Sequence, residues 1–136
     1  MRLPDWKSRL TLYVSDAARR PFCEGSHDCA LFLAGGVEAQ TGFDPAARWR
    51  GCYTTTRSGL RLLRKTGFPD HIALAASLLP EIAPAFAQAG DGAMVSDPQM
   101  PDVPALGIVQ GEMIYVLRPD GLGLLPLTSA LRAFRV

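Results

Sequence analysis

One apolar segment constrains the fold of this chain more than any other. Residues 30–37 read Ala-Leu-Phe-Leu-Ala-Gly-Gly-Val, and in a helix over residues 28–40 these side chains point in nearly every direction around the axis. Such a helix is buried on most of its faces. Each glycine inside it costs about 1 kcal/mol relative to alanine, which close approach of another element usually offsets. We therefore expect a central helix that begins at an N-cap, either Asp28 or Ser26, and stops at Thr41-Gly42.

Three further helices are predicted from apolar residues spaced at helical intervals. The first covers residues 5–19 and ends before Pro21, which cannot continue a helix. The other two cover residues 54–65 and 69–79, after the central helix. The helical part of the chain is therefore expected to extend over about residues 1–79.

The connection over residues 43–53 and the helix after it contain residue types that are common at interfaces. Trp49 and Tyr53 are two of them, and buried tryptophan and tyrosine are at least as frequent. The helix also has a basic stripe, which consists of Arg57, Arg61, Arg64 and Lys65. A net charge of +1 gives no reason to assign this stripe to nucleic acid. The stripe is either a solvated face or a docking face for an acidic partner.

From Gly90 onward, short β runs replace the helical periodicity. A final turn, capped by Thr128, is expected to run through Phe134. Helices followed by an antiparallel meander over about residues 90–127 indicate an α+β fold. A chain of 136 residues has the length of one domain, residues 1–136. The predicted strands cover residues 92–95, 105–109, 113–117 and 122–127.

Composition and missing motifs exclude several kinds of site. Cys23, Cys29 and Cys52 have neither the even number of a disulfide framework nor the spacing of a zinc site. There is no P-loop, no GxGxxG and no HExxH, so no cofactor and no metal are predicted. The N-terminus has no apolar leader and no apolar run is long enough to cross a bilayer. We therefore expect synthesis in a reducing cytoplasm and no membrane span.

Cys29 is the candidate nucleophile, because the segment Gly25-Ser26-His27-Asp28-Cys29 places it at the first turn of the central helix. Backbone N–H groups and the helix dipole favour a thiolate there. A cysteine peptidase also needs a histidine within hydrogen-bond reach. His27 would lie about 200° away around the axis if both residues were helical, which suits a loop or capping role better than that of a base. His71 begins a separate helix. Cys29 is thus a nucleophile, the remnant of one, or a small core residue.

Three segments resemble the NlpC-type cell-wall peptidases, which are papain-like cysteine enzymes that cleave peptidoglycan stem peptides. Residues 28–32 (Asp-Cys-Ala-Leu-Phe) resemble the nucleophile segment, and residues 90–95 resemble the Gly-Asp-led strand of that family. Residues 105–111 (Ala-Leu-Gly-Ile-Val-Gln-Gly) are similar to its strand of the form His-Val-Gly-Ile-Tyr-Leu-Gly. The resemblance extends over about residues 22–117. It implies a papain-like fold in which a central helix packs on a β meander.

The fuller pattern resembles a small variant family encoded in phage and prophage tail gene clusters. Residues 21–29 match Pro-Phe-x-x-Gly-x-x-Asp-Cys, residues 41–45 match Thr-Gly-x-Asp-Pro, and residues 50–53 match Arg-Gly-x-Tyr. The C-terminal Ala-Phe-Arg-Val of residues 133–136 also fits this family. This resemblance implies other tail or tail-tip proteins as partners, and a place in a virion or phage-like particle.

One position departs from the peptidase pattern. The resemblance places the general-base histidine at Ala105 and the polar residue that orients it near Tyr115. Alanine cannot take a proton from the thiol of Cys29. A structural or assembly protein of a phage tail, with a degenerate peptidase fold, is therefore the first hypothesis. The alternative is an active cysteine endopeptidase that cleaves peptidoglycan peptides as the phage genome enters the cell, with its base supplied by another residue or chain.

Overall fold

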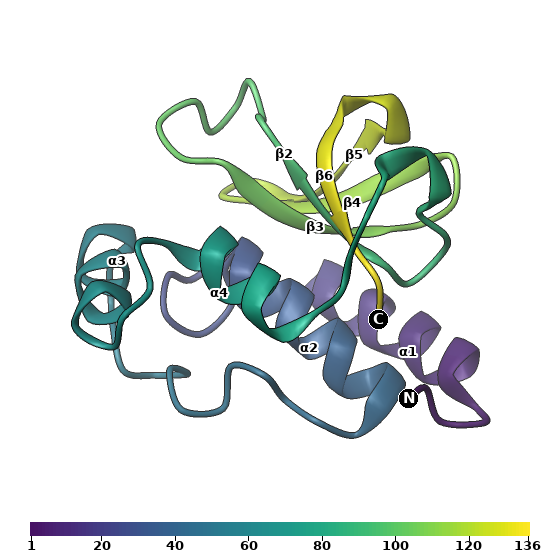
Figure 1. The fold of residues 1–136 in the computed structure, drawn as a ribbon, viewed down its shortest axis with the longest axis horizontal. Helices are drawn as coiled ribbons and strands as arrows, with labels where there is room; N and C mark the ends of the chain where they lie inside the picture. Colours follow the sequence, from purple (N-terminus) through teal and green to yellow (C-terminus); the bar gives the residue numbers. More distant parts are fainter.

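Four α-helices form the first part of the chain in the computed structural model, which describes residues 1–136 (Figure 1). Their positions confirm the four predicted helices to within two residues at each end. Asp28, Thr55 and Asp70 cap the last three, because each side chain accepts a hydrogen bond from a backbone N–H three residues further on. The helices are α1 (Trp6–Arg19), α2 (Cys29–Thr41), α3 (Thr56–Lys65) and α4 (His71–Leu78).

Six strands form one antiparallel sheet in the order β1-β6-β2-β3-β4-β5. The α+β class and the four predicted strands are therefore confirmed, since β2 to β5 follow one another as a meander. Two short 3-10 helices, Pro84–Phe86 and Leu127–Ser129, connect the strands. The strands are β1 (Glu81–Ile82), β2 (Gly92–Val95), β3 (Ala105–Val109), β4 (Met113–Arg118), β5 (Gly121–Pro126) and β6 (Ala130–Phe134).

The predicted final turn through Phe134 is wrong, because residues 130–134 form strand β6. This strand lies between β1 and β2, with Ala133 opposite Ala93 and Phe134 opposite Gly92. Ala133 and Phe134 are fully buried. The backbone groups of a buried segment need hydrogen-bond partners, and the β2 ladder supplies them. Pairing between distant segments thus outweighs the local preference for a turn.

Helix α2 occupies the centre of the fold, with α1 along one side and the sheet on the other (Figure 1). A side chain at position 35 would overlap the ring of Tyr13, and a Cβ at position 36 would lie 2.5 Å from Cδ1 of Ile108. The hydroxyl of Tyr13 also donates a 2.8 Å hydrogen bond to the carbonyl of Phe32. The two glycines therefore allow α1 and β3 to approach α2, which confirms the predicted central helix.

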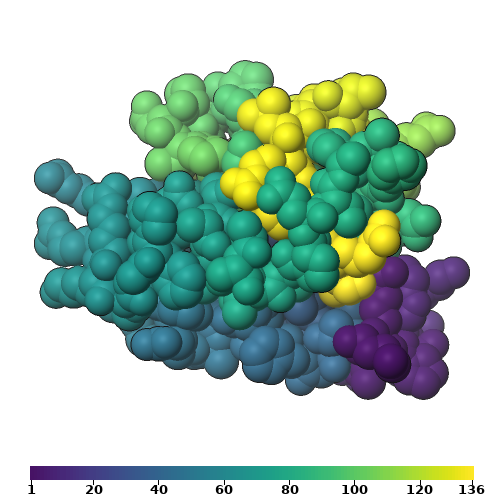
Figure 2. Space-filling model, viewed as in Figure 1, coloured from purple at the N-terminus to yellow at the C-terminus, as the bar shows by residue number.

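The two faces of the sheet are covered differently. Leu106, Ile108 and Leu117 belong to the core between sheet and helices, whereas Ile114 and Val116 belong to a second apolar cluster on the opposite face. The helical layer, purple to teal, lies below the green and yellow β layer in Figure 2. None of the four helices has the length and apolarity that a bilayer span requires.

Asp91 joins the two ends of the chain to the sheet. Its carboxylate is buried and accepts hydrogen bonds from Arg2 (3.3 Å) and from the backbone N–H of Val136 (3.1 Å). The backbone N–H of Gln88 binds the other carboxylate oxygen at 2.9 Å. The aspartate that leads strand β2 therefore has a structural role at the place where the termini meet.

Candidate functional site

The start of α2 is organised around the carboxylate of Asp28. Oδ1 accepts a 3.0 Å hydrogen bond from the backbone N–H of Leu31, as an N-cap does. Oδ2 accepts from the backbone N–H of Gly25 at 3.0 Å and from the hydroxyl of Tyr53 at 2.5 Å. Asp28 is buried, and burial of a carboxylate requires such partners. These three donors hold the segment before Cys29 in one conformation.

Gly25 and Tyr53 bring the first and third sequence motifs together. Gly25 has φ +89°, and a Cβ on it would overlap the carbonyl oxygen of Tyr53. Its own carbonyl accepts a 2.9 Å hydrogen bond from the N–H of Gly51. Burial, together with the hydrogen bond to Asp28, raises the pKa of Tyr53, so its hydroxyl remains a donor. Glycine at position 25 is therefore required by both its backbone conformation and its contact.

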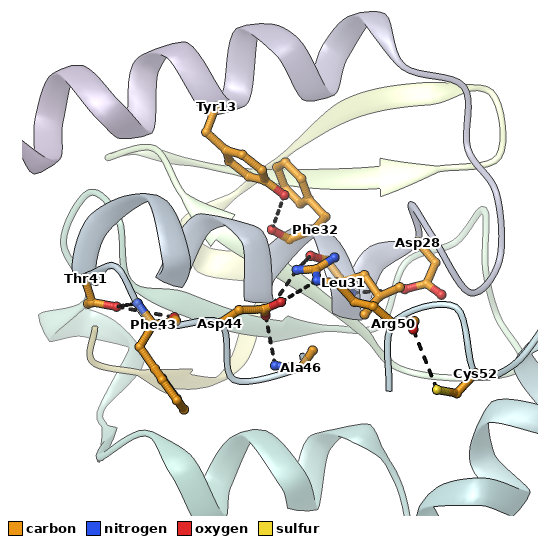
Figure 3. A network of polar contacts seen from close by, with 10 residues as sticks. All are labelled: Tyr13, Asp28, Leu31, Phe32, Thr41, Phe43, Asp44, Ala46, Arg50 and Cys52. Carbon is orange, nitrogen blue, oxygen red and sulfur yellow. Dashed lines mark hydrogen bonds and ion pairs between the residues drawn. The ribbon is translucent and has the colours of Figure 1, made fainter. Parts of the chain in front are cut away.

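An ion pair joins the second motif to the third. Arg50 Nε lies 2.6 Å from Oδ2 of Asp44, and Arg50 Nη2 lies 3.3 Å from Oδ1 (Figure 3). The same Nη2 donates to the carbonyl of Leu31 in the first turn of α2, at 3.3 Å. Asp44 also accepts from the N–H of Ala46 at 3.0 Å. All three motifs thus meet around the first turn of α2, which their separation in the sequence does not reveal.

Cys29 is the first residue of α2 and is half-buried. Its side chain packs against the second apolar cluster, to which Ala105 at the start of β3 belongs. Burial raises the pKa of the thiol to about 11, and the charge of Asp28 acts in the same direction, while the backbone N–H groups of Leu106 and Ala30 lower it. Burial therefore outweighs the helix N-terminus, and the thiol is protonated at neutral pH.

His27 is tied to α1 and has no hydrogen bond to Cys29. Its side chain is buried, and Nε2 donates a 3.1 Å hydrogen bond to the carbonyl of Ala17 near the end of α1. Its backbone pairs with Cys23 through two hydrogen bonds, of 2.9 and 2.7 Å. Burial lowers the pKa of the imidazole. In this arrangement His27 anchors the connection between α1 and α2.

Ala105 and Tyr115 are the residues at which the resemblance to the peptidases places the base and, nearby, its orienting residue. Ala105 is the first residue of β3 and is buried; the backbone of the next residue, Leu106, contacts the Cys29 thiol. The antiparallel register pairs Tyr115 with Ile108, which places Tyr115 three residues along the sheet from Ala105. Of Ala105 and Tyr115, only Ala105 therefore lies close to Cys29.

A largely apolar cavity of about 140 Å³ adjoins Cys29. It is lined by residues of α2, α3 and α4, by the connection over residues 45–53 and by the loop before β3. His71 lines it as well, with Nε2 2.8 Å from the carbonyl of Pro104. The structure thus brings His71 to the same cavity as Cys29, which the sequence did not predict.

Trp49 lines this cavity too, and its indole Nε1–H is the only buried side-chain nitrogen or oxygen without a hydrogen-bond partner. The ring is held by an edge-to-face contact with Phe68, with centroids 6.3 Å apart. An unsatisfied buried donor costs about 1–3 kcal/mol. The residue type of Trp49 predicts a place at an interface or in the core, but nothing in the sequence indicates that its donor is unpaired.

One family comparison covers the whole chain. The family model described as "Domain of unknown function (DUF6950)" matches residues 1–136. The chain belongs to the DUF6950 family. No curated protein and no solved structure matches it.

The DUF6950 chain therefore has a cysteine at a helix start, a rigid polar network around it and an apolar cavity beside it. No group of three or more His, Cys, Asp or Glu side chains is placed to hold a metal ion. The thiol has no hydrogen-bonded histidine, so nothing in this arrangement takes its proton.

Proposed function

We propose that this protein is a structural or assembly protein of a phage or prophage tail, with a degenerate NlpC-type papain-like fold. The observation that carries the proposal is that Cys29 lies beside the start of β3. The residue of the nucleophile position opens α2 beside the start of β3, and Ala105 stands there in place of the base. This arrangement is compatible with the geometry of a cysteine peptidase, but alanine at position 105 cannot act as the base.

The surroundings of Cys29 support a role without catalysis. A nucleophilic cysteine needs a lowered pKa or a neighbouring base. Burial instead raises the pKa of Cys29 to about 11. His27 is engaged with the carbonyl of Ala17 in α1. The hydrogen bonds to Asp28 cap α2 and hold the adjacent loops. They stabilise the conformation of the helix start and transfer no proton.

The surface supports docking onto other proteins of the tail or tail tip. Large apolar side chains are exposed at Leu12, Phe43, Phe86 and Leu131. Two of them are phenylalanines, and aromatic residues are enriched at protein interfaces. The basic stripe on α3 is exposed as well and suits an acidic partner. In this proposal the protein is made in the cytoplasm and assembled into a virion or phage-like particle.

An active cysteine endopeptidase for peptidoglycan stem peptides is the second candidate, and one observation favours it. His71 and Cys29 line the same cavity. In this candidate, a movement of α4 brings the imidazole of His71 within hydrogen-bond reach of the thiol. The Nε2 atom of His71 is engaged with Pro104 in this structure. In this candidate, His71 or a residue of a partner chain supplies the base.

Turnover of purified muropeptides separates the two candidates. The wild-type protein, Cys29→Ala and His71→Ala are incubated with muropeptides, and products are followed by mass spectrometry. We expect no cleavage by any of the three folded proteins. Cleavage by the wild type that Cys29→Ala abolishes would overturn the structural proposal, and its loss in His71→Ala would identify the base. The protein should also be detected by mass spectrometry in purified particles, cross-linked to a tail protein.

A further inference from the structure

We propose that the free edge of strand β5 pairs with the β5 edge of a second copy of this chain, which gives a two-fold symmetric dimer with one continuous sheet. Three features of β5 carry this inference: the backbone groups at its edge, its residue types and its fit to itself around Gly123. None of them depends on the assignment of the protein to a phage tail.

Strand β5 is the last strand of the sheet, so one of its backbone edges has no neighbouring strand. The N–H of Leu127 donates to the carbonyl of Glu112 at 2.9 Å, and bonded pairs alternate along an antiparallel ladder. In the β4–β5 register, this alternation bonds the odd-numbered residues of β5 to β4. The N–H and C=O of Leu122 and Leu124 therefore point away from β4, and they bind no other segment of the chain.

Strand β5 lacks the features that keep exposed edges from pairing with other chains. Natural edges are usually very short, or they carry a charged side chain, a bulge or a proline. Residues 121–126 read Gly-Leu-Gly-Leu-Leu-Pro, with proline only at the end, and the β4–β5 register is continuous. The opposite edge is protected, because β1 has only two residues and one of them, Glu81, forms an ion pair with Arg132. We therefore expect pairing at β5 and not at β1.

A two-fold axis at Gly123 matches the edge of β5 with itself. It places Leu122 of each copy opposite Leu124 of the other, and each of these pairs exchanges both of its N–H···O=C bonds. Gly123 meets its counterpart at the axis with Cα atoms about 4.5 Å apart, and it has no side chain to obstruct this approach. Pro126 has no N–H, so the ladder ends there.

The same arrangement covers an exposed leucine. Leu122 packs against the core between sheet and helices, and alternation along the strand places Leu124 on the same face. Leu124 is 49% exposed in the single chain. Opposite residues of an antiparallel pair have Cβ atoms about 4.5–5.5 Å apart, so Leu124 of each copy would pack against Leu122 of the other. A second copy therefore fits this edge in both hydrogen bonding and apolar contact.

Sedimentation equilibrium of the full chain tests the proposal. A small interface gives weak association, so we expect a reversible monomer–dimer equilibrium between about 10 μM and 1 mM. Hydrogen exchange at the amides of Leu122 and Leu124 should slow as the concentration rises. The amide of Leu125, which is bonded to β4, should be equally protected throughout. Isotope-filtered spectra of a mixed labelled and unlabelled sample should show contacts between the α-protons of Gly123 in the two copies.

Two substitutions at one exposed position act on the edge alone. Leu124→Pro removes an outward N–H and no hydrogen bond to β4, and Leu124→Lys adds a charge to the edge. Each should raise the dissociation constant of the dimer about tenfold or more. Leu131→Lys is the matched control, because Leu131 is 60% exposed and β2, β3 and β4 lie between its strand and β5. It should leave the dissociation constant unchanged.

Three results would overturn the proposal. A folded wild-type protein that stays monomeric up to about 1 mM does not pair through this edge. A dimer that both folded Leu124 variants form as readily as the wild type uses another surface. A dimer in which the amides of Leu122 and Leu124 exchange as fast as in the monomer has no ladder between the two copies.

Discussion

The hydroxyl of Tyr53 donates a 2.5 Å hydrogen bond to Oδ2 of Asp28, the carboxylate whose other oxygen caps α2. The two residues are 25 positions apart in the sequence. The loop that contains Tyr53 therefore helps to hold the first turn of the central helix. This relationship makes the stability of the helix start depend on a side chain outside the helix.

Tyr53→Phe removes this donor and leaves the ring in place. Hydrogen bonds to charged groups contribute about 1.5–3 kcal/mol, so we expect the variant to lose stability of this order. Urea unfolding measures the change. Tyr115→Phe is the control, because the hydroxyl of Tyr115 makes no hydrogen bond within the protein, and it should change stability little. Equal effects of the two substitutions would show that the Asp28 contact contributes nothing.

Gly35→Ala tests the close approach of α1 to α2. Alanine at a helix interior position gains about 1 kcal/mol over glycine. The added methyl group would overlap the ring of Tyr13, and overpacking of this kind costs about 1–3 kcal/mol. We expect net destabilisation in urea unfolding. Tyr13→Leu combined with Gly35→Ala should recover part of the loss. A stabilised single variant would contradict the packing described for α2.

The pKa of Cys29 predicts a loss of stability in alkaline solution. The thiol titrates at about 11 when folded and near its ordinary value of 9.0 when unfolded. The unfolded chain therefore releases this proton first, so stability is fully present below pH 9.0 and decreases as the pH rises toward 11. Urea unfolding of the wild type and of Cys29→Ala over this range should show the decrease reduced in the variant. Parallel curves would contradict a raised pKa.

The reactivity of Cys29 gives a second measurement of the same property. Cys23 and Cys52 are exposed, and both are replaced by serine to leave one thiol. Alkylation by iodoacetamide requires the thiolate, so we expect its rate to keep rising with pH, without a plateau, up to pH 10. A plateau near neutral pH would show an activated cysteine and would favour the peptidase candidate.

Phe134→Ala tests strand β6. Phe134 is fully buried in the core between helices and sheet, and such a truncation costs about 3–5 kcal/mol. Leu131 lies in the same strand and is 60% exposed, so Leu131→Ala should change stability by less than about 0.5 kcal/mol. Thermal or urea unfolding of both variants measures the difference. Similar values would contradict the placement of β6 inside the sheet.

Local patterns were sufficient for most elements of the fold. The four helices have their own periodicity, and the last three have their own caps, such as Asp28, whose capping contacts lie three residues away in either direction. Strands β2 to β5 follow one another as a meander, and the short turns between β3, β4 and β5 also leave a local signal. The C-terminal strand was missed because β6 pairs with segments about 40 and 50 residues earlier in the chain, and no neighbouring residue reports that pairing.

The sequence by itself determined the α+β class, the buried central helix and the position of Cys29 at its start, since each follows from interactions between near neighbours. Only the tertiary structure decided which residues surround the thiol of Cys29. It placed Ala105 beside the thiol, tied His27 to α1, brought His71 to the same cavity and left the donor of Trp49 unpaired. Burial and hydrogen-bond partners depend on segments distant in the sequence, and these set the pKa of a thiol.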